Sequence, residues 1–309
     1  MTDLLPPPSP LRHFLELNDL SRSELLEVLA LGRRLKSGEG GGGRPLGGRT
    51  MALIFRKHST RTRVSFEVAL HQLGAHSIFL SDRDTQIGRG ESMADTARVL
   101  SGYVDGIMIR TFEHEEVEEL AAYAGIPVIN SLTDRVHPCQ LLADLMVLQE
   151  EFGEELRGLR VAWVGDGNNV ANSWLNASAL LGFELRLAVP EGCEPDPGIL
   201  ARARAAAPVT LTRDPVEAVA GAHAVNTDVW ASMGQEAEVE RRHALFRPFQ
   251  VNTALMEEAD PSAVFLHCLP VHREEEVTPE VIDGPRSRVF SQSENRLHGQ
   301  KALLLHLMT

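Results

Sequence analysis

Apolar segments of strand length alternate with helical patterns along most of this chain. The segments are Met51 to Phe55, Ser77 to Leu80, Gly106 to Ile109, Ile126 to Ile129, Leu159 to Val164, Leu185 to Val189, Val209 to Leu211, Ala224 to Val225 and Val264 to Leu266. Strands that alternate with helices predict βαβ units, and therefore open parallel sheets covered by helices. The predicted fold class is α/β, with two doubly wound parallel-sheet domains joined by interdomain helices.

The chain of 309 residues is long for one hydrophobic core and favours two domains of roughly 150 residues. A helical pattern from about His137 to Phe152 separates two series of strands, so the boundary is predicted along or just after it. This gives a first domain over residues 1–150 and a second over residues 151–309. The last pattern, Leu297 to Met308, is also helical. We expect that helix to pack back on the first domain.

The composition excludes several classes of partner. A formal net charge of −13 argues against nucleic acid and makes local arginine clusters conspicuous. No run of about 18 apolar residues could span a bilayer, and the N-terminus lacks the charged and then apolar pattern of a secretion signal. Cys139, Cys193 and Cys268 are odd in number and far apart, which fits reduced thiols. We therefore expect a cytoplasmic protein with no membrane or nucleic-acid partner.

Hydroxyl and guanidinium groups cluster in Ser59-Thr60-Arg61-Thr62-Arg63, between the apolar segment ending at Phe55 and a helical pattern. The first backbone N–H groups of a helix lack partners, and its dipole is positive at this end. A phosphate would therefore find amide, hydroxyl and cationic donors together. The alternative is an ordinary helix cap with two solvated arginines. The segment is not a P-loop, because the Gly-x-x-x-x-Gly-Lys-Ser/Thr pattern is absent.

Polar residues that follow the predicted strands are further candidates, because ligands of open parallel sheets bind beyond the carboxyl ends of the strands. Arg110 ends one strand and needs an anionic partner, which could be a substrate or an internal carboxylate. His137 and Gln140 flank Pro138, which suits the first position of a helix. Their imidazole and amide could hold a carbonyl oxygen and an NH2 group. A simple capping histidine is the alternative reading of His137.

The turn Val164-Gly-Asp-Gly-Asn-Asn-Val170 is similar to a dinucleotide-binding turn, but valine stands at the third glycine position. No acidic residue ends a following strand near position 190 convincingly. We therefore do not expect a nicotinamide cofactor. Asn168 or Asn169 could instead contact a polar substrate.

The last cluster combines His267-Cys268-Leu269-Pro270 with Asp228, Ser232 and Met233 upstream. Zinc is not expected, because adjacent histidine and cysteine have poor ligand geometry and no Cys-x-x-Cys pair is present. A thiol and a carboxylate at two strand ends could instead receive an amino group and its proton. For Cys268 alone, a buried apolar thiol is the alternative.

Taken together, six motifs resemble the ornithine carbamoyltransferase family, in order over nearly the whole chain. They are Phe55-Arg-Lys-His-Ser-Thr-Arg-Thr-Arg63, His137-Pro-Cys-Gln140, Asp166-Gly-Asn-Asn169, Asp228-Val-Trp-Ala-Ser-Met-Gly234, His267-Cys-Leu-Pro270 and Glu294-Asn-Arg-Leu-His-Gly299. The first two resemble the carbamoyl-phosphate motifs of transcarbamylases in general. The Asp-x-x-x-Ser-Met and His-Cys-Leu-Pro elements are similar to those of enzymes that use ornithine rather than aspartate.

The resemblance implies a role for each matching residue. Carbamoyl phosphate is expected to contact Ser59, Thr60, Arg61, Thr62, Arg110, His137, Gln140, Cys268, Leu269 and Arg296. Ornithine is expected to contact Asn169, Asp228, Ser232 and Met233. The residues expected to take part in the reaction are Arg110, His137, Gln140, Asp228 and Cys268. The resemblance also implies a homotrimer in which Gln86 completes a neighbour's site. Gly90 replaces a lysine or other polar residue common in the family, and Arg89 could substitute for it.

The activity implied by the resemblance is carbamoyl transfer from carbamoyl phosphate to the side-chain amine of L-ornithine, giving L-citrulline and phosphate. The reaction serves arginine synthesis or catabolism, and it requires no metal or organic cofactor. Attack by the amine builds negative charge on the carbonyl oxygen and then on phosphate, so fixed donors should supply much of the rate. One alternative is transfer to another amine, such as putrescine or an N-acylated ornithine. A remote alternative is a non-catalytic module that binds phosphate ligands.

Overall fold

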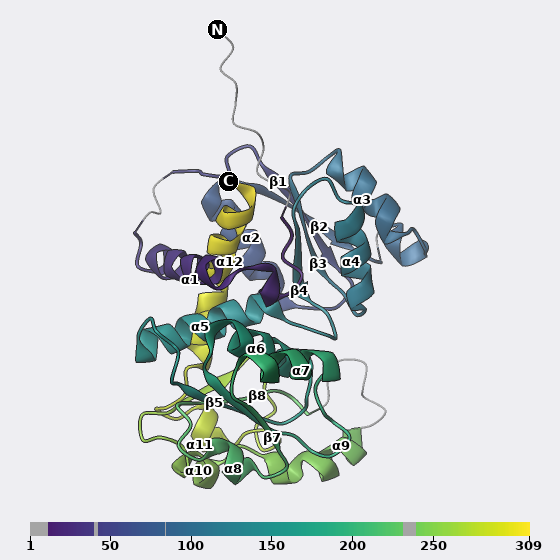
Figure 1. Cartoon of the computed structure of the whole chain (residues 1–309). Coiled ribbons are helices and arrows are strands. Elements are labelled where there is room, and N and C mark those ends of the chain that lie inside the picture. Colours follow the sequence, from purple (N-terminus) through teal and green to yellow (C-terminus); the bar gives the residue numbers. More distant parts are fainter. Residues whose placement is uncertain (1–11, 40–42, 84, 231–238) are drawn as a thin grey trace.

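The computed structural model describes residues 12–39, 43–83, 85–230 and 239–309. These residues form two parallel sheets, one of four strands and one of five, which lie one above the other with helices between and around them (Figure 1). The prediction of an α/β fold with two doubly wound parallel sheets is therefore confirmed. In the described part of the chain, no helix is long and apolar enough to cross a membrane.

The first sheet has the strand order β2-β1-β3-β4. Its strands are β1 (Thr50–Phe55), β2 (His76–Ser81), β3 (Gly106–Arg110) and β4 (Val128–Leu132). The helices that connect or follow them are α2 (Thr60–Leu73), α3 (Met93–Ser101) and α4 (His114–Tyr123). A short 3-10 helix, η2 (Ile87–Arg89), lies in the loop after β2. Strands β1, β3 and β4 are buried almost throughout, as expected for parallel strands covered on both faces.

The second sheet has the strand order β7-β6-β5-β8-β9. Its strands are β5 (Arg160–Val164), β6 (Glu184–Ala188), β7 (Val209–Thr212), β8 (Ala224–Thr227) and β9 (Val264–His267). Its helices are α6 (Asn169–Leu181), α7 (Pro197–Ala206), α8 (Pro215–Val219), α9 (Val239–Phe246), α10 (Thr253–Glu257) and α11 (Pro279–Ile282). Two further 3-10 turns are η1 (Leu17–Asp19) and η4 (Arg247–Phe249).

Each sheet has one point at which the chain reverses its direction of travel across the strands. In the first sheet the chain moves from β1 to β2 and then returns to β3 on the other side of β1. In the second sheet it moves from β5 through β6 to β7 and then returns to β8 on the other side of β5. The loops at these two points diverge and leave a crevice at the carboxyl ends of the strands. The fold therefore offers two places for a ligand, one on each sheet.

Helices α5 (Pro138–Phe152) and α12 (Val289–Met308) connect the two halves of the structure, and α1 (Arg22–Lys36) packs on both of them. Helix α12 packs on α1, α2 and α5, and it also contacts β9 (Figure 1, yellow helix). Helix α5 is buried on nearly all sides, which its predominantly apolar composition permits. One apolar cluster runs from Leu53 of β1 through Leu142 of α5 to Trp163 of β5. The predicted boundary at position 150 falls in the last turn of α5.

Two element boundaries differ from the sequence prediction. The strand predicted from Ile126 to Ile129 is shifted toward the C-terminus in the structure, where β4 covers Val128–Leu132 and includes the polar residue Ser131. The Ser131 hydroxyl donates to the carbonyl oxygen of Ile109 at 3.0 Å, so its polar group is satisfied inside the sheet. Helix α12 begins at Val289 and not at Leu297. Its first two turns bury several polar side chains, and these break the apolar pattern that marks its later part.

Candidate active site

Hydrogen bonds join the two strand-end regions across the molecule. The guanidinium of Arg61, in α2, donates to the carbonyl oxygen of Leu269, just after β9, at 2.6 Å. Arg296 of α12 donates to Thr62 Oγ1 at 2.7 Å and to Gln140 Oε1 at 3.1 Å. Residues far apart in the sequence therefore meet between the two sheets. This region contains most of the residues predicted to bind substrate.

The first part of the site is the N-terminus of α2. Ser59 is the N-cap residue, and its hydroxyl accepts from the backbone N–H of Thr62 at 3.2 Å. Thr60, the first residue of the helix, is exposed, whereas Thr62 is buried. The segment before the helix starts beside Arg110, because Phe55 pairs with Arg110 in the sheet register. The parallel register of β1 and β3 thus places a helix N-terminus next to a strand-end guanidinium.

Three guanidinium groups, those of Arg61, Arg110 and Arg296, gather around this helix end. The Nε atoms of all three are buried without a hydrogen-bond partner. Burial, together with the neighbouring Arg296 and Arg61, lowers the pKa of Arg110 to about 9. Burial likewise lowers the pKa of Arg296, and the positive charge of Arg61 contributes. Like charges held together in this way destabilise each other and favour the arrival of a multivalent anion.

His137 is the N-cap residue of α5, with Pro138 at the first helical position, as the sequence predicted. Its side chain is buried, and its Nδ1 has no hydrogen-bond partner. Burial lowers the pKa of His137 well below its usual value, and the charges of Arg296, Arg110 and Arg61 lower it further. The imidazole is therefore neutral at physiological pH. A neutral imidazole can donate one N–H to a carbonyl oxygen without adding a fourth positive charge to the site.

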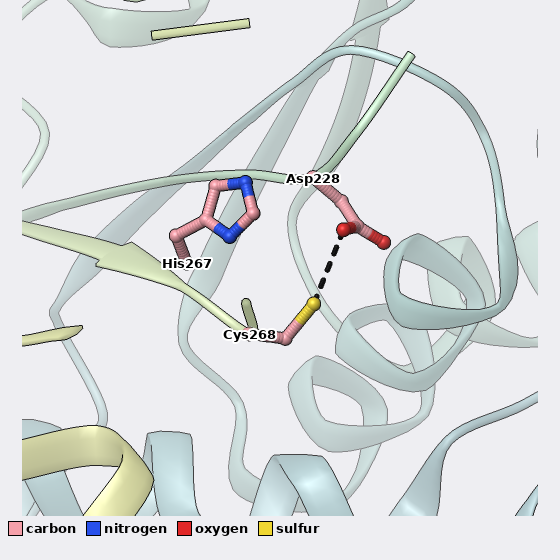
Figure 2. Close-up of side chains that lie close together, drawn as sticks. All are labelled: Asp228, His267 and Cys268. Atoms are coloured by element: carbon pink, nitrogen blue, oxygen red, sulfur yellow. Dashed lines mark hydrogen bonds between the residues drawn. The ribbon is translucent and has the colours of Figure 1, made fainter. Parts of the chain in front are cut away.

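The second part of the site lies at the ends of β8 and β9, where the register pairs Thr227 with His267. The next residue on each strand is therefore also a neighbour, and the thiol of Cys268 donates to Asp228 Oδ1 at 3.1 Å (Figure 2). The other oxygen, Asp228 Oδ2, accepts from the side-chain amide of Asn168 at 2.8 Å. Burial and the carboxylate of Asp228 raise the pKa of Cys268 well above its usual value. The thiol is consequently a hydrogen-bond donor and not a thiolate.

Leu269 has a left-handed backbone conformation, with φ of 58°. This conformation is uncommon for a residue other than glycine and is often found at functional sites. The N–H of Leu269 donates to His267 Nδ1 at 2.9 Å, and its carbonyl oxygen accepts from Arg61. His267 Nε2 lies 3.0 Å from Glu276 Oε1, and both side chains are fully buried. The Leu269 peptide is therefore held from both sides.

Asp228, His267 and Cys268 bring three possible metal-ligand atoms close together (Figure 2). Each of these atoms already has a protein partner. Cys268 and Asp228 share a hydrogen bond, and both ring nitrogens of His267 are engaged, one by Leu269 N and one by Glu276. A protonated thiol is also a poor metal ligand, because the thiolate is the form that binds metals. The donor set therefore fits a hydrogen-bonded site better than a metal centre.

Not every predicted residue lies at this centre. The amide of Asn169 donates to the carbonyl oxygen of Thr133 at 2.6 Å, whereas its neighbour Asn168 contacts Asp228. Gln86 precedes η2 after the edge strand β2 and is exposed, as is Arg89. Ser232 and Met233 lie outside the described residues.

Two buried residues at the site were missed by the sequence reasoning. Asp144 accepts from the amide of Gln140 at 2.7 Å, and Gln292 of α12 donates to the same carboxylate at 2.6 Å. The spacing of Gln140 and Asp144 by four residues on one helix is a signal that could have indicated the first contact. The contact of Gln292 depends on packing of the C-terminal helix, and no local pattern predicts it.

An open pocket of about 460 Å³ lies on the outer side of the α2 N-terminus. Ser59 and Thr60 contribute to its wall, and the basic residues Arg56, Lys57, His58, Arg63 and Arg83 also line it. Arg110, His137 and Cys268 do not line it. The pocket therefore adjoins the N-terminus of α2 and not the centre at which the two strand-end regions meet.

Two family models match this chain, and together they cover most of its length. The carbamoyl-phosphate-binding domain of aspartate/ornithine carbamoyltransferases matches residues 12–150, and the aspartate/ornithine-binding domain matches residues 157–307. A curated ornithine carbamoyltransferase of Pelobacter propionicus is 56% identical over 301 residues, which cover 96% of this chain and 98% of the relative. One from Anoxybacillus flavithermus is 56% identical over 304 residues and covers 96% of each chain.

Solved structures give the same result. The ornithine carbamoyltransferase of Pyrococcus furiosus has a TM-score of 0.91 at 50% identity and covers 96% of this chain and 97% of its own. The enzyme of Thermus thermophilus has a TM-score of 0.88 at 48% identity, with 96% and 99% coverage. Fold and sequence both agree with these relatives over nearly the full length. This chain belongs to the aspartate/ornithine carbamoyltransferase family, and the relatives described here are ornithine carbamoyltransferases.

Proposed function

We propose that this protein transfers the carbamoyl group of carbamoyl phosphate to the side-chain amine of L-ornithine, giving L-citrulline and phosphate. One observation carries the proposal. The N-terminus of α2, with three guanidinium groups around it, is joined to the region of the thiol–carboxylate pair by the hydrogen bond from Arg61 to Leu269. An acyl phosphate held by the first would present its carbonyl carbon to an amine held by the second.

In this proposal the phosphate lies at the N-terminus of α2. Ser59, Thr60 and Thr62 supply hydroxyl and amide donors, and Arg61 and Arg296 supply charge. Arg110 reaches both the phosphate and the carbonyl oxygen, and neutral His137 donates to that oxygen. Gln140 accepts from the carbamoyl NH2. These donors stand where negative charge develops during attack, so they lower the barrier without having to reorganise.

Ornithine lies on the side of Asp228 and Cys268 in this proposal, with Asn169, Ser232 and Met233 as its further contacts. Its side-chain amine has a lysine-like pKa near 10.4 in water and must lose a proton before it attacks. The reacting amine forms the new C–N bond as the C–O bond to phosphate breaks. The departing phosphate carries away the electron pair, and the surplus proton leaves with it. The low-dielectric surroundings of Cys268 favour the neutral amine.

We also infer a homotrimer in which Gln86 of one subunit contributes to the site of the next. The open pocket beside Ser59 and Thr60 leaves room for a residue from a neighbour, which supports this arrangement. A cytoplasmic location is consistent with the free thiols of Cys139, Cys193 and Cys268.

The test is a steady-state assay of the purified protein with carbamoyl phosphate and a panel of amines. Ornithine should give citrulline, and putrescine and N-acetylornithine should give little product. If putrescine or N-acetylornithine were carbamoylated faster than ornithine, that amine and not ornithine would be the substrate. Binding of carbamoyl phosphate with no product from any amine would leave only the non-catalytic alternative. Saturation curves in both directions would show whether synthesis or phosphorolysis of citrulline is favoured.

A further inference from the structure

A chain of buried polar side chains connects the two halves of the site. Asp144 Oδ1 accepts from the amide nitrogens of Gln140 and Gln292, at 2.7 Å and 2.6 Å. Gln292 Oε1 in turn accepts from the backbone N–H of His267 at 2.9 Å. Asp144, Gln292 and Gln140 have exposed fractions of 0%, 0% and 1%. Burial shields these hydrogen bonds from bulk water, so their geometry depends strongly on the chemistry of the partners.

That chemistry allows the Gln140 amide only one orientation. The NH2 group of Gln140 faces Asp144 and donates to Oδ1 at 2.7 Å, and this oxygen can accept whether the carboxyl is ionised or carries its proton on Oδ2. A guanidinium donates and cannot accept, so the carbonyl oxygen of Gln140 must face Arg296, which donates to it at 3.1 Å. Rotating the amide by 180° would place oxygen against oxygen and N–H against N–H. Asp144 and Arg296 therefore impose the same orientation from opposite ends.

The orientation decides what Gln140 can recognise. Arg296 also donates to Thr62 Oγ1 at 2.7 Å, so the Gln140 oxygen lies beside the N-terminal turn of α2. Its remaining lone pair is an acceptor, and an acceptor stabilises a ligand that presents an N–H. An acyl phosphate with a methyl group at this position would leave the oxygen partly unsatisfied, which carries a desolvation cost.

We propose that Asp144 is the positioning residue that sets the specificity for a carbamoyl over an acetyl group, by fixing the Gln140 carbonyl oxygen toward the acyl phosphate. This inference rests on the proposed function, because it takes carbamoyl phosphate as the ligand. The same carboxylate also holds Gln292 and, through it, the backbone at His267. One buried group thus fixes Gln140 on the carbamoyl side and the strand end before Cys268 on the amine side.

The test compares binding of carbamoyl phosphate and acetyl phosphate to the full-length protein by calorimetry. The two ligands differ by NH2 against CH3, and both carry the phosphate. In Asp144→Leu, which removes the acceptor, affinity for carbamoyl phosphate should fall about tenfold while affinity for acetyl phosphate stays within about twofold. Asp144→Asn keeps an oxygen that can accept from both amides, so it should retain the discrimination. Asp144→Ser, whose hydroxyl is too short to reach Gln140, replaces Asp144→Leu if that variant does not fold.

A second arm separates positioning from a general structural effect. In a Gln140→Ala background, Asp144→Leu should no longer change the ratio of the two affinities, because the residue through which Asp144 acts has been removed. Gln292→Leu removes the other donor to Asp144 and should leave the ratio unchanged. Equal weakening of both ligands in Asp144→Leu, or a changed ratio that persists without Gln140, would overturn the inference. Citrulline formation by the unaltered protein is a separate measurement, so failure of the proposed function would not be mistaken for this outcome.

Discussion

At the scale of single residues, the site concentrates positive charge before any substrate arrives. Arg61, Arg110 and Arg296 surround the start of α2, and each has an Nε atom without a partner. Keeping such groups buried lowers the stability of the free protein. Binding of a phosphate dianion would remove that penalty. The unfavourable free energy of burying these charges together is therefore part of the folding free energy, and the ligand binds to donors that are already in place.

The first prediction follows from this charge. Arg110→Ala and Arg61→Ala should each weaken carbamoyl-phosphate binding by about 1.5–3 kcal/mol, because each removes charge-assisted hydrogen bonds in a partly desolvated site. Calorimetry with the purified variants measures the change. Arg63→Ala is the matched control, since Arg63 belongs to the same motif but pairs with Glu67 on the exposed face of α2. Unchanged affinity in both Arg110→Ala and Arg61→Ala would contradict the phosphate assignment.

The second prediction concerns pH. Burial raises the pKa of Asp144 to about 7, although hydrogen bonds from Gln140 and Gln292 act in the opposite direction. In the unfolded chain this carboxyl titrates near 3.9, so between about pH 4 and 7 the folded state holds a proton that the unfolded state releases. This contribution to stability is fully present below about pH 4 and is lost as the pH rises through about 7.

Asp144→Asn has no such proton. Its free energy of unfolding should therefore rise relative to the native protein by roughly 2–4 kcal/mol between pH 4 and pH 8. Urea denaturation of both proteins at matched concentrations across this range provides the measurement, and the pH dependence of all other groups cancels in the difference. A difference that stays constant with pH would show that Asp144 has an ordinary pKa.

Local chemistry explains why some site residues were predictable and others were not. Ser59, Arg110 and His137 stand at strand ends or helix starts, and those positions can be read from short patterns. Asp144 and Gln292 lie inside helices, where polar residues normally face solvent. Their burial depends on a second helix packed against them, which a local pattern does not contain.

At the scale of elements, the glycine turn after β5 has a packing role. Gly167 donates its N–H to the carbonyl oxygen of Cys193 at 2.8 Å. A Cβ atom at Gly167 would lie 2.3 Å from Pro195 N and 2.4 Å from Cys193 O. The turn resembles a dinucleotide-binding turn because both need close backbone approach. Here the backbone that approaches belongs to the segment after β6 and not to a ligand.

The third prediction tests this contact. Gly167→Ala should destabilise the protein by about 1–3 kcal/mol, because backbone atoms and not a flexible side chain must move to admit the methyl group. The shift should also move Asn168, the partner of Asp228. Thermal unfolding provides the measurement. Gly102→Ala is the control, since its Cβ would meet Val99 O at an ordinary 3.5 Å. Equal stability of the two variants would show that the loop after β6 adapts freely.

Element positions show where sequence periodicity succeeds and where it fails. Strands such as β3 and β5 were predicted because burial on both faces requires nearly continuous apolar residues. The start of α12 was not predicted, because its buried residues there are polar and bind polar partners. These residues are Gln292, Asn295 and Arg296. Periodicity reports burial of apolar groups, so it cannot mark a helix turn that is buried by hydrogen bonding.

At the scale of the whole molecule, the two sheets use one topology to perform two tasks. In each sheet the chain reverses its direction of travel beside the first strand, β1 or β5. The polar groups of each half of the site lie near these two points. The alternation of strands and helices was enough to predict both sheets. It could not predict that the two carboxyl edges would be joined, because the contacts of Arg61 with Leu269 and of Arg296 with Thr62 span more than 200 positions.

The fourth prediction concerns assembly. If Gln86 reaches a neighbour's site, Gln86→Ala and Arg110→Ala subunits should each be severely impaired alone and should partly restore activity when mixed. In a closed head-to-tail ring, each site draws residues from two chains, so a mixed oligomer can contain one site with neither substitution. The exposure of Gln86 and its place on the loop after an edge strand make such a contact sterically accessible.

The experiment requires subunit exchange under mild denaturant, followed by removal of the denaturant and assay of citrulline formation. Each parent is treated identically, and hybrids are identified by a charge tag on one parent. A ring of three with one Gln86→Ala subunit and two Arg110→Ala subunits, or the reverse, contains one intact site. Activity should therefore rise above that of both parents and follow the fraction of hybrids. Activity equal to the parents, in a preparation shown to contain hybrids, would mean that each site is built within one subunit. Gln86 would then act on its own chain.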